Sequence, residues 1–314
     1  MPSRGRGRRI LAVLAVLTVL AGAGTLWLLR DPRPHFLERR SQLVSADEGP
    51  ESRTAGHATR SVTLRAANGL GVDLMLRYPV PAEARVTSRE SRPVFLILGG
   101  YRTGDRAATL IENTHGAIIA AMGYPYRGPL NPKGLAVLPL VPAIREAILD
   151  TPPSVLLAID YLRSRPDVDT SRVELVGASF GVPFVSVAAA LDSRVSRLWL
   201  VHGAGRPVQL IERGLERSVP WAPLRWPVAH LANVLASGPR LAPEKWVPQV
   251  APRPVIMINA RADERLPRAA IDALHASARQ PKEVIWLPGQ HVQPNREEVI
   301  RALVETVLAR AARP

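Results

Sequence analysis

The chain has 314 residues, of which 46% are hydrophobic and 22% are charged, a composition typical of a globular protein and not of a disordered one. It contains no cysteine, which excludes disulfide bonds, thiolate metal sites and a cysteine nucleophile. The formal net charge is +14, but the arginines are scattered and are not interleaved with aromatic residues, so we do not expect nucleic-acid binding.

An apolar segment lies near the amino terminus. Residues 10–29 carry no charged side chain and follow an arginine-rich start, and twenty helical residues would rise about 30 Å, enough to cross the core of a bilayer. We therefore expect residues 1–30 to form a single-pass membrane anchor, with the rest of the chain outside the cytoplasm. The alternative is a cleaved signal peptide, because Ala21-Gly22-Ala23 has the small-x-small pattern of a cleavage site. Cleavage would leave a secreted or periplasmic protein.

The next segment, residues 31–60, is polar, contains Gly and Pro, and lacks apolar periodicity. Such a composition is typical of a flexible tether. We expect a folded domain to begin at about residue 61.

Alternating apolar and helical patterns fill residues 61–314. A β-hairpin is predicted around Asn68-Gly69. Short apolar runs that are typical of buried strands follow at residues 94–98, 117–122, 198–201, 255–258 and 284–287, and a further strand is predicted at residues 173–176. Helical patterns separate several of these runs, and residues 295–311 form a closing amphipathic pattern. The order predicts an α/β fold with a mostly parallel central sheet and helices on both faces.

A sharp strand-to-helix turn is predicted at Gly177-Ala178-Ser179-Phe180-Gly181, between the run 173–176 and an Ala-rich helical pattern. Such a turn holds its serine in a strained backbone conformation and requires small residues at Gly177 and Gly181, where helix and strand pass closely. It also directs the start of the helix, including the Phe180 N–H, at the place where an oxyanion would form. The alternative, without a catalytic role, is that Ser179 is an ordinary N-cap of the following helix.

A serine nucleophile needs a base, and the base needs a carboxylate to hold it. Asp263 follows the apolar run 255–258, and His291 follows the run 284–287. All three candidates thus fall at carboxyl ends of strands, where open α/β sheets place their sites. Two rivals remain open at this stage: Glu264 for the acid and His202 for the base.

With these residues in place, the chain resembles the α/β-hydrolase superfamily, and within it the dienelactone-hydrolase and prolyl-oligopeptidase-like serine esterases and peptidases. The resemblance covers about residues 61–310 and depends on four segments: residues 164–169, 175–181, 253–267 and 289–291. It implies a nucleophile at Ser179, an acid at Asp263 and a base at His291. Where that family has a His-Gly-x segment, this chain has Gly99-Gly100-Tyr101, so we expect the Tyr101 N–H to be the second oxyanion donor.

Residues 206–248 exceed what one strand and one helix need, and we expect an inserted helical cap there. Its Trp221, Trp226 and Trp246 are candidates for an apolar substrate pocket, although they could instead pack the cap onto the sheet. No motif implies a metal or a cofactor. The sequence as a whole predicts a serine hydrolase that cleaves a carboxylic ester, or a related acyl bond, in a small-molecule substrate. An acyltransferase with the same triad, or a catalytically silent membrane-tethered binding protein, is the alternative.

Overall fold

The computed structural model describes residue 24 and residues 30–54, 56–80, 91–130, 132 and 134–311. Among these residues, no helix combines the length and the apolar character that crossing a membrane requires. Apart from Gly24, the apolar segment 10–29 lies outside the described residues. The membrane anchor therefore stays a prediction.

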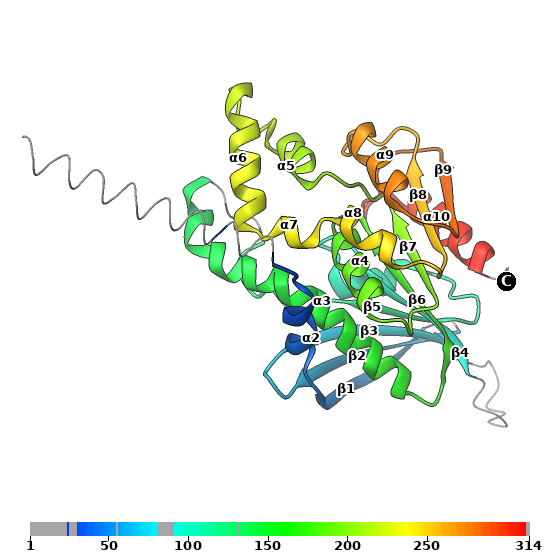
Figure 1. The fold of residues 1–314 in the computed structure, drawn as a ribbon. Helices are drawn as coiled ribbons and strands as arrows, with labels where there is room; N and C mark the ends of the chain where they lie inside the picture. The colour runs from blue at the N-terminus through cyan, green and yellow to red at the C-terminus, as the bar shows by residue number, and fades with distance from the viewer. Residues whose placement is uncertain are drawn as a thin grey trace, which may run out of the picture.

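One sheet forms the centre of the described part of the chain (Figure 1). Its order is β1-β2-β3-β5-β4-β6-β7-β8-β9; β1, β2 and β3 are antiparallel to their neighbours, and the strands from β5 to β9 are parallel. The strands are β1 (Leu43–Thr54), β2 (His57–Ala66), β3 (Gly71–Pro79), β4 (Arg92–Leu98), β5 (Ile118–Met122), β6 (Val168–Ala178), β7 (Arg197–Val201), β8 (Val255–Ala260) and β9 (Lys282–Leu287). The predicted α/β fold with a mostly parallel sheet is confirmed.

The strand order reverses at β4. This strand pairs with β5 on one side and with β6 on the other, so the chain builds the sheet outward in two directions from it. A crevice forms at such a reversal, at the carboxyl ends of the strands, because the connections leave toward opposite faces. The end of β6 lies at this crevice.

Helices cover both faces of the sheet. On one face the core joins alternate strand residues to α2 (Arg33–Arg40), α3 (Val141–Ser164), α4 (Val182–Leu191), α8 (Pro243–Trp246) and α9 (Arg268–Ser277). On the other face it joins the intervening strand residues to α10 (Glu297–Ala311) and the 3-10 helix η1 (Gly104–Leu110). Strand β4 shows the alternation, since Val94, Leu96 and Leu98 belong to the first core and Phe95 to the second.

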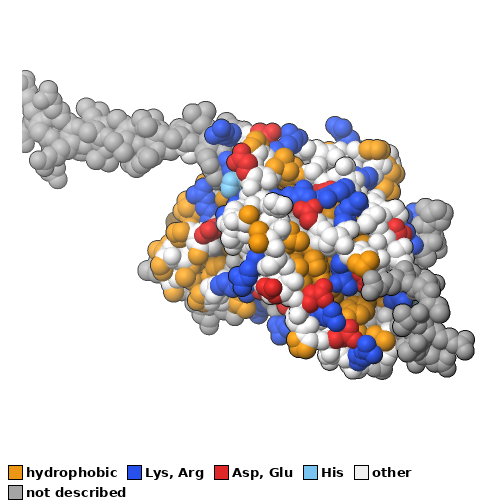
Figure 2. All heavy atoms as spheres, turned by 90° about the horizontal axis from the view of Figure 1, so that it is seen from below, with side chains coloured by type: hydrophobic (Ala, Val, Ile, Leu, Met, Phe, Trp, Pro, Cys, Tyr) orange, Lys and Arg blue, Asp and Glu red, His pale blue; other side chains and the backbone are white. Residues whose placement is uncertain are grey.

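The remaining helices lie in connections. They are η2 (Gly134–Leu140), η3 (Ser179–Gly181), α5 (Pro207–Leu215), α6 (Ala222–Leu235), α7 (Gly238–Leu241) and η4 (Val247–Gln249). Helices α5 to α8 lie between β7 and β8, in the stretch for which an insertion is predicted, and α6 stands away from the sheet (Figure 1). Seen from below, basic side chains are interspersed with acidic and hydrophobic ones (Figure 2).

The predicted flexible tether is wrong for most of its length. Residues 33–40 form α2 and residues 43–54 form β1, which pairs with β2 along its length. Phe36 is fully buried, and the Arg39 guanidinium donates two hydrogen bonds of 2.7 Å to Asp150 of α3. The sequence pattern does not predict β1, because an edge strand is held by backbone pairing and needs few apolar side chains.

Candidate active site

The turn between β6 and α4 holds Ser179 in a strained backbone conformation. Its φ is 53°, in the left-handed region that side chains rarely adopt. A Cβ added at Gly181 would overlap the carbonyl of Leu98 at the end of β4, and one added at Gly177 would overlap Val185 of α4. The structure therefore has the sharp turn that the sequence predicts, and the strain lifts the serine to the carboxyl edge of the sheet.

Ser179, His291 and Asp263 form one chain of hydrogen bonds. The Ser179 Oγ lies 2.8 Å from His291 Nε2, and His291 Nδ1 lies 2.8 Å from Asp263 Oδ2. The His291 residue is 1% exposed, and the Asp263 side chain is 2% exposed. Three residues that are far apart in the sequence are thus brought together in the order nucleophile, base and acid that acyl transfer requires.

The Asp263 carboxylate is stabilised by more than the histidine. Its second oxygen accepts the backbone N–H groups of Arg265 at 2.9 Å and Leu266 at 3.0 Å. Burial would raise the pKa of Asp263, but the hydrogen bond from His291, the charge of that ring and these N–H groups outweigh burial and lower the pKa below its ordinary value. The carboxylate therefore stays ionised and can orient the imidazole.

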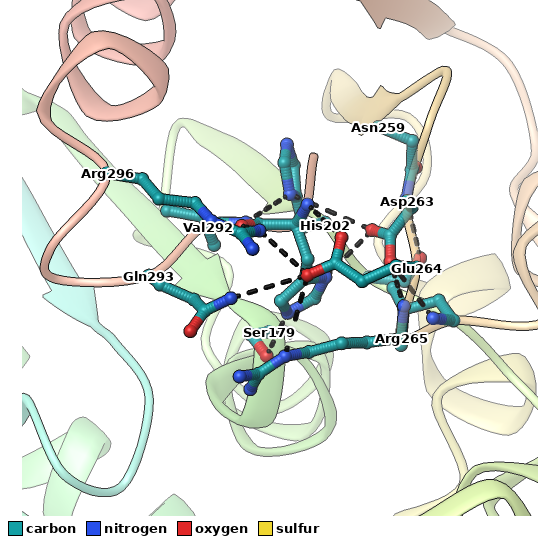
Figure 3. A network of polar contacts seen from close by, with 12 residues as sticks. Ser179, His202, Asn259, Asp263, Glu264, Arg265, Val292, Gln293 and Arg296 are labelled. Atoms are coloured by element: carbon teal, nitrogen blue, oxygen red, sulfur yellow. Dashed lines mark hydrogen bonds and ion pairs between the residues drawn. The ribbon is translucent and has the colours of Figure 1, made fainter. Parts of the chain in front are cut away.

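Glu264, the other candidate for the acid, has a different set of hydrogen-bond partners (Figure 3). One of its carboxylate oxygens accepts the backbone N–H of His291 at 3.0 Å, and the other accepts Arg296 Nη1 at 2.8 Å and Gln293 Nε2 at 3.3 Å. These bonds tie the loop after β8 to the loop after β9. The acidic pair at 263 and 264 is the sequence signal for both roles, but spacing alone does not assign them.

His202, the rival base, lies behind the triad and makes no hydrogen bond to Ser179 among the described contacts. Its Nδ1 accepts the N–H of Val292 at 2.8 Å and lies 3.9 Å from Asp263 Oδ2. Burial and the neighbouring His291 lower the pKa of His202 to about 4, so the ring is neutral at physiological pH. With Nδ1 accepting, the proton of the neutral ring is on Nε2.

The donor atoms of His202, Asp263 and His291 lie within 4.8 Å of one another, a spacing at which three such groups could hold a metal ion. In this structure each group already has a hydrogen-bond partner: the Val292 N–H for His202, Ser179 and Asp263 for His291. The arrangement therefore fits proton transfer through the imidazole directly.

The two predicted oxyanion donors lie beside the nucleophile. Tyr101 follows β4 and Phe180 follows Ser179, and both line the same cavity as Ser179. Their rings meet edge to face with centroids 5.9 Å apart, and both residues are 43% exposed. The Tyr124 hydroxyl steadies the strand end beside them by donating a 2.5 Å hydrogen bond to the carbonyl of Gly99. The backbone of residues 99–101 therefore lies at the nucleophile's side of the crevice.

A cavity of about 730 Å³ opens at Ser179. Its walls come from the second face of the sheet, from η1 and from α10, and include Phe95, Ile119, Ile300 and Leu308. A second cavity of about 400 Å³ shares Tyr101 and Phe180 with the first but lies toward Tyr124 and α3, and Ser179 does not line it. The first cavity is the space that a substrate bound at Ser179 can occupy.

The predicted tryptophan pocket is wrong. Trp221 and Trp226 are 64% and 59% exposed, and neither lines the cavity at Ser179. Trp246 is 3% exposed, but it packs edge-on against Phe36 and donates a 2.8 Å hydrogen bond to the Arg240 carbonyl. The physical reason is that α6 stands away from the sheet. The cavity instead lies under α10, beside strands whose sequence pattern predicts only core residues.

Comparisons of the sequence with known proteins find relatives over about half of the chain. No family model matches the chain. The uncharacterised protein YfhR of Salmonella typhimurium is 30% identical over 156 residues, and that of Salmonella typhi is 27% identical over 142 residues. These alignments cover 47% and 43% of this chain and 49% and 45% of the relatives, so the chain spans about half the length of the curated relatives it matches.

Solved structures match over most of the chain. An acetyl xylan esterase from Paenibacillus sp. R4 has a TM-score of 0.63 at 17% identity and covers 87% of this chain and 92% of its own. Acetyl xylan esterase 1 from Thermoanaerobacterium has a TM-score of 0.61 at 14% identity, with coverage of 88% and 94%. The alpha/beta hydrolase GrgF from Penicillium has a TM-score of 0.52 at 15% identity, with coverage of 85% and 100%. The chain therefore has the fold of the α/β-hydrolase superfamily.

Proposed function

We propose that this protein is a serine hydrolase that cleaves a carboxylic ester through an acyl-enzyme intermediate. The observation that carries the proposal is the hydrogen-bonded chain from Ser179 through His291 to Asp263, placed at a strained turn on the carboxyl edge of the sheet. A serine hydroxyl gains nucleophilicity only when a base accepts its proton, and this geometry supplies that base.

In the first half of the reaction, Ser179 Oγ attacks the acyl carbonyl and its proton moves to His291 Nε2. The tetrahedral intermediate collapses when the C–O bond to the alcohol breaks, and His291 returns the proton to the departing oxygen. Water then attacks the acyl-enzyme and loses a proton to His291. The bond between the acyl carbon and Ser179 Oγ breaks, His291 returns the proton to Oγ, and the carboxylic acid is released. Asp263 stays ionised throughout and stabilises the protonated ring.

The negative charge on the intermediate needs donors that are already in place. We assign this role to the N–H groups of Phe180 and Tyr101, which lie at the start of the helix after Ser179 and at the end of β4. Preorganised backbone donors of this kind contribute about 100-fold to 1,000-fold to the rate.

The fold neighbours support an ester as the bond that is cleaved, because two of them are named acetyl xylan esterases. The membrane assignment has support from the sequence alone. We propose that residues 1–30 hold the domain at a membrane, with the active site outside the cytoplasm.

The test is labelling of the purified full-length protein by a fluorophosphonate, with turnover of p-nitrophenyl esters in parallel. We expect labelling and turnover in the wild type and in the control Ser171→Ala, whose hydroxyl is exposed and bonds only to Asp169 among the described contacts. Both signals should vanish in Ser179→Ala. A folded wild-type protein that neither labels nor turns over would instead indicate a silent binding protein, and acyl transfer to an added alcohol in preference to water would indicate a transferase.

A further inference from the structure

We propose that the cavity under α10 is an acyl-chain pocket, which selects esters of straight-chain fatty acids of about eight to ten carbons. The inference rests on the proposed function, because it places the acyl group of the substrate at Ser179. It goes beyond that function by naming the class of acid and the residues that limit the length of its alkyl chain.

The pocket exists because of how β4 is connected to β5. These parallel neighbours are joined by residues 99–117, in which the regular structure is the seven-residue 3-10 helix η1. Parallel crossovers usually carry an α-helix that packs on the sheet. Here η1 covers less of the face, and α10 lies across the gap, so space remains between the sheet and α10.

Two structural elements give the depth of this space. Along α10 the lining residues run from Ile300 to Leu308, and at 1.5 Å per residue this is roughly 12 Å. Along β4 they run from Gly99 back to Phe95, and at about 3.3 Å per residue this is roughly 13 Å. An extended alkyl chain with bonds of about 1.5 Å advances about 1.3 Å per carbon. The pocket therefore accommodates roughly eight to ten carbons.

The chemistry of the walls changes with depth. At the carboxyl edge the lining includes Ser179, Arg265 and Gln293. Farther in, it consists of apolar side chains from β4, β5, η1 and α10, with Phe95 and Ile119 at 3% and 2% exposure. A polar mouth over an apolar interior matches a fatty acyl ester, whose one polar group is the ester itself.

The apolar interior behind a polar mouth also assigns the cavity to the acid part of the ester. The acyl group must stay bound through both half-reactions, whereas the alcohol must leave before water enters. A pocket that runs inward between sheet and helix suits the part that stays. The second cavity, which includes Asp73, Asp105 and Arg127 in its lining, is more polar and lies on the other side of Tyr101 and Phe180. The alcohol leaves on that side.

The first measurement is the chain-length profile of the wild-type protein on p-nitrophenyl esters from acetate to dodecanoate, below the concentrations at which they form micelles. Each buried methylene contributes about 0.8 kcal/mol, which corresponds to about a fourfold gain in kcat/KM per carbon. We expect kcat/KM to rise steeply to about eight to ten carbons and then to fall. The matching series of acetate esters with lengthening alcohols should show no such optimum.

Tryptophan substitutions on α10 test where the chain lies. Leu308→Trp fills the deep end, so the optimum should shorten by several carbons, and Ile300→Trp fills the mouth, so only short acyl groups should be accepted. Glu305→Trp places the same side chain on the exposed side of the same helix and should leave the profile unchanged. Thermal melting of all three variants confirms that they are folded.

The outcomes separate this inference from the proposed function. If the wild type labels with fluorophosphonate but prefers acetate, the hydrolase stands and the acyl pocket is overturned. If it does not label, the proposed function fails, and the pocket is then tested by binding of decanoate to Ser179→Ala in calorimetry. Binding that Leu308→Trp weakens at least tenfold and Glu305→Trp does not would support the pocket. No binding by Ser179→Ala would overturn it.

Discussion

The imidazole of His202 accepts the backbone N–H of Val292 at 2.8 Å, and this bond joins the end of β7 to the loop that carries His291. The ring is 1% exposed, and its centroid lies 5.3 Å from that of His291. A buried neutral histidine in this position holds the loop that carries His291 and makes no described hydrogen bond to Ser179. It also makes the folded state sensitive to acid.

The first prediction concerns this sensitivity. Burial and the neighbouring His291 lower the pKa of His202 to about 4, while in the unfolded chain it is about 6.5. Between these values the unfolded state binds the proton and the folded state does not, so stability falls as the pH drops from 6.5 toward 4. From pH 7 to pH 5 the wild type should lose about 2 kcal/mol of unfolding free energy through this residue.

His202→Asn isolates the effect, because asparagine does not titrate and tolerates the left-handed backbone at this position, where φ is 47°. Urea unfolding of both proteins at pH 7, 6 and 5 measures it. The variant should be less stable at pH 7 and should lose less stability on acidification. Equal losses in the two proteins would contradict the assignment of a depressed pKa to His202.

The second prediction separates the two neighbouring carboxylates. Asp263→Asn removes the acceptor that holds the tautomer of His291, and kcat should fall by about 1,000-fold to 10,000-fold with KM little changed. Glu264→Gln keeps an oxygen for the His291 N–H and should lower kcat less than about tenfold. Steady-state kinetics of both variants on one ester decide the matter, and the reverse order would transfer the acid role to Glu264.

The third prediction concerns the close approach at the nucleophile turn. A Cβ at Gly181 would meet the Leu98 carbonyl, which is backbone and cannot rotate away. Gly181→Ala should therefore cost about 1–3 kcal/mol of unfolding free energy and displace Ser179, with loss of most of the esterase activity. Gly214 in α5 has open space around its Cα, so Gly214→Ala should be neutral or slightly stabilising. Full activity in Gly181→Ala would show that the turn relaxes freely.

The fourth prediction tests whether α2 is part of the domain. Phe36 is 0% exposed, and truncation to alanine should cost about 3–5 kcal/mol of unfolding free energy. Its neighbour Leu37 is 47% exposed, so Leu37→Ala should change stability by less than about 0.5 kcal/mol. Urea denaturation of the two variants gives both numbers. Similar small effects would mean that residues 33–40 do not contribute to folding.

The arrangement of Ser179, Asp263 and His291 is predictable from the sequence because each residue follows shortly after a strand of the parallel sheet. The runs before Asp263 and His291 are apolar, the run before Ser179 is apolar apart from Glu174, and parallel strands bring their carboxyl ends to one edge. Topology thus assembles three residues that local pattern identifies one at a time.

The cavity at Ser179 is not predictable in this way. Phe95, Ile119 and Val307 have the apolar spacing of core residues, and nothing in the sequence distinguishes a side chain that fills the core from one that lines an empty space. The predicted tryptophan pocket fails for a related reason. Leu231 in α6 has the helical spacing of a packed residue but is 60% exposed, because its helix stands away from the sheet.

The packing of α2 and β1 into the domain has a consequence for where the folded body begins. Thirty flexible residues would have separated the domain from position 30 by a variable distance of roughly 30 Å. Instead, Arg33 donates a 2.6 Å hydrogen bond to Gln249, and α2 and β1 belong to the folded body. The folded body therefore begins within a few residues of position 30, and not at position 61 after a thirty-residue linker.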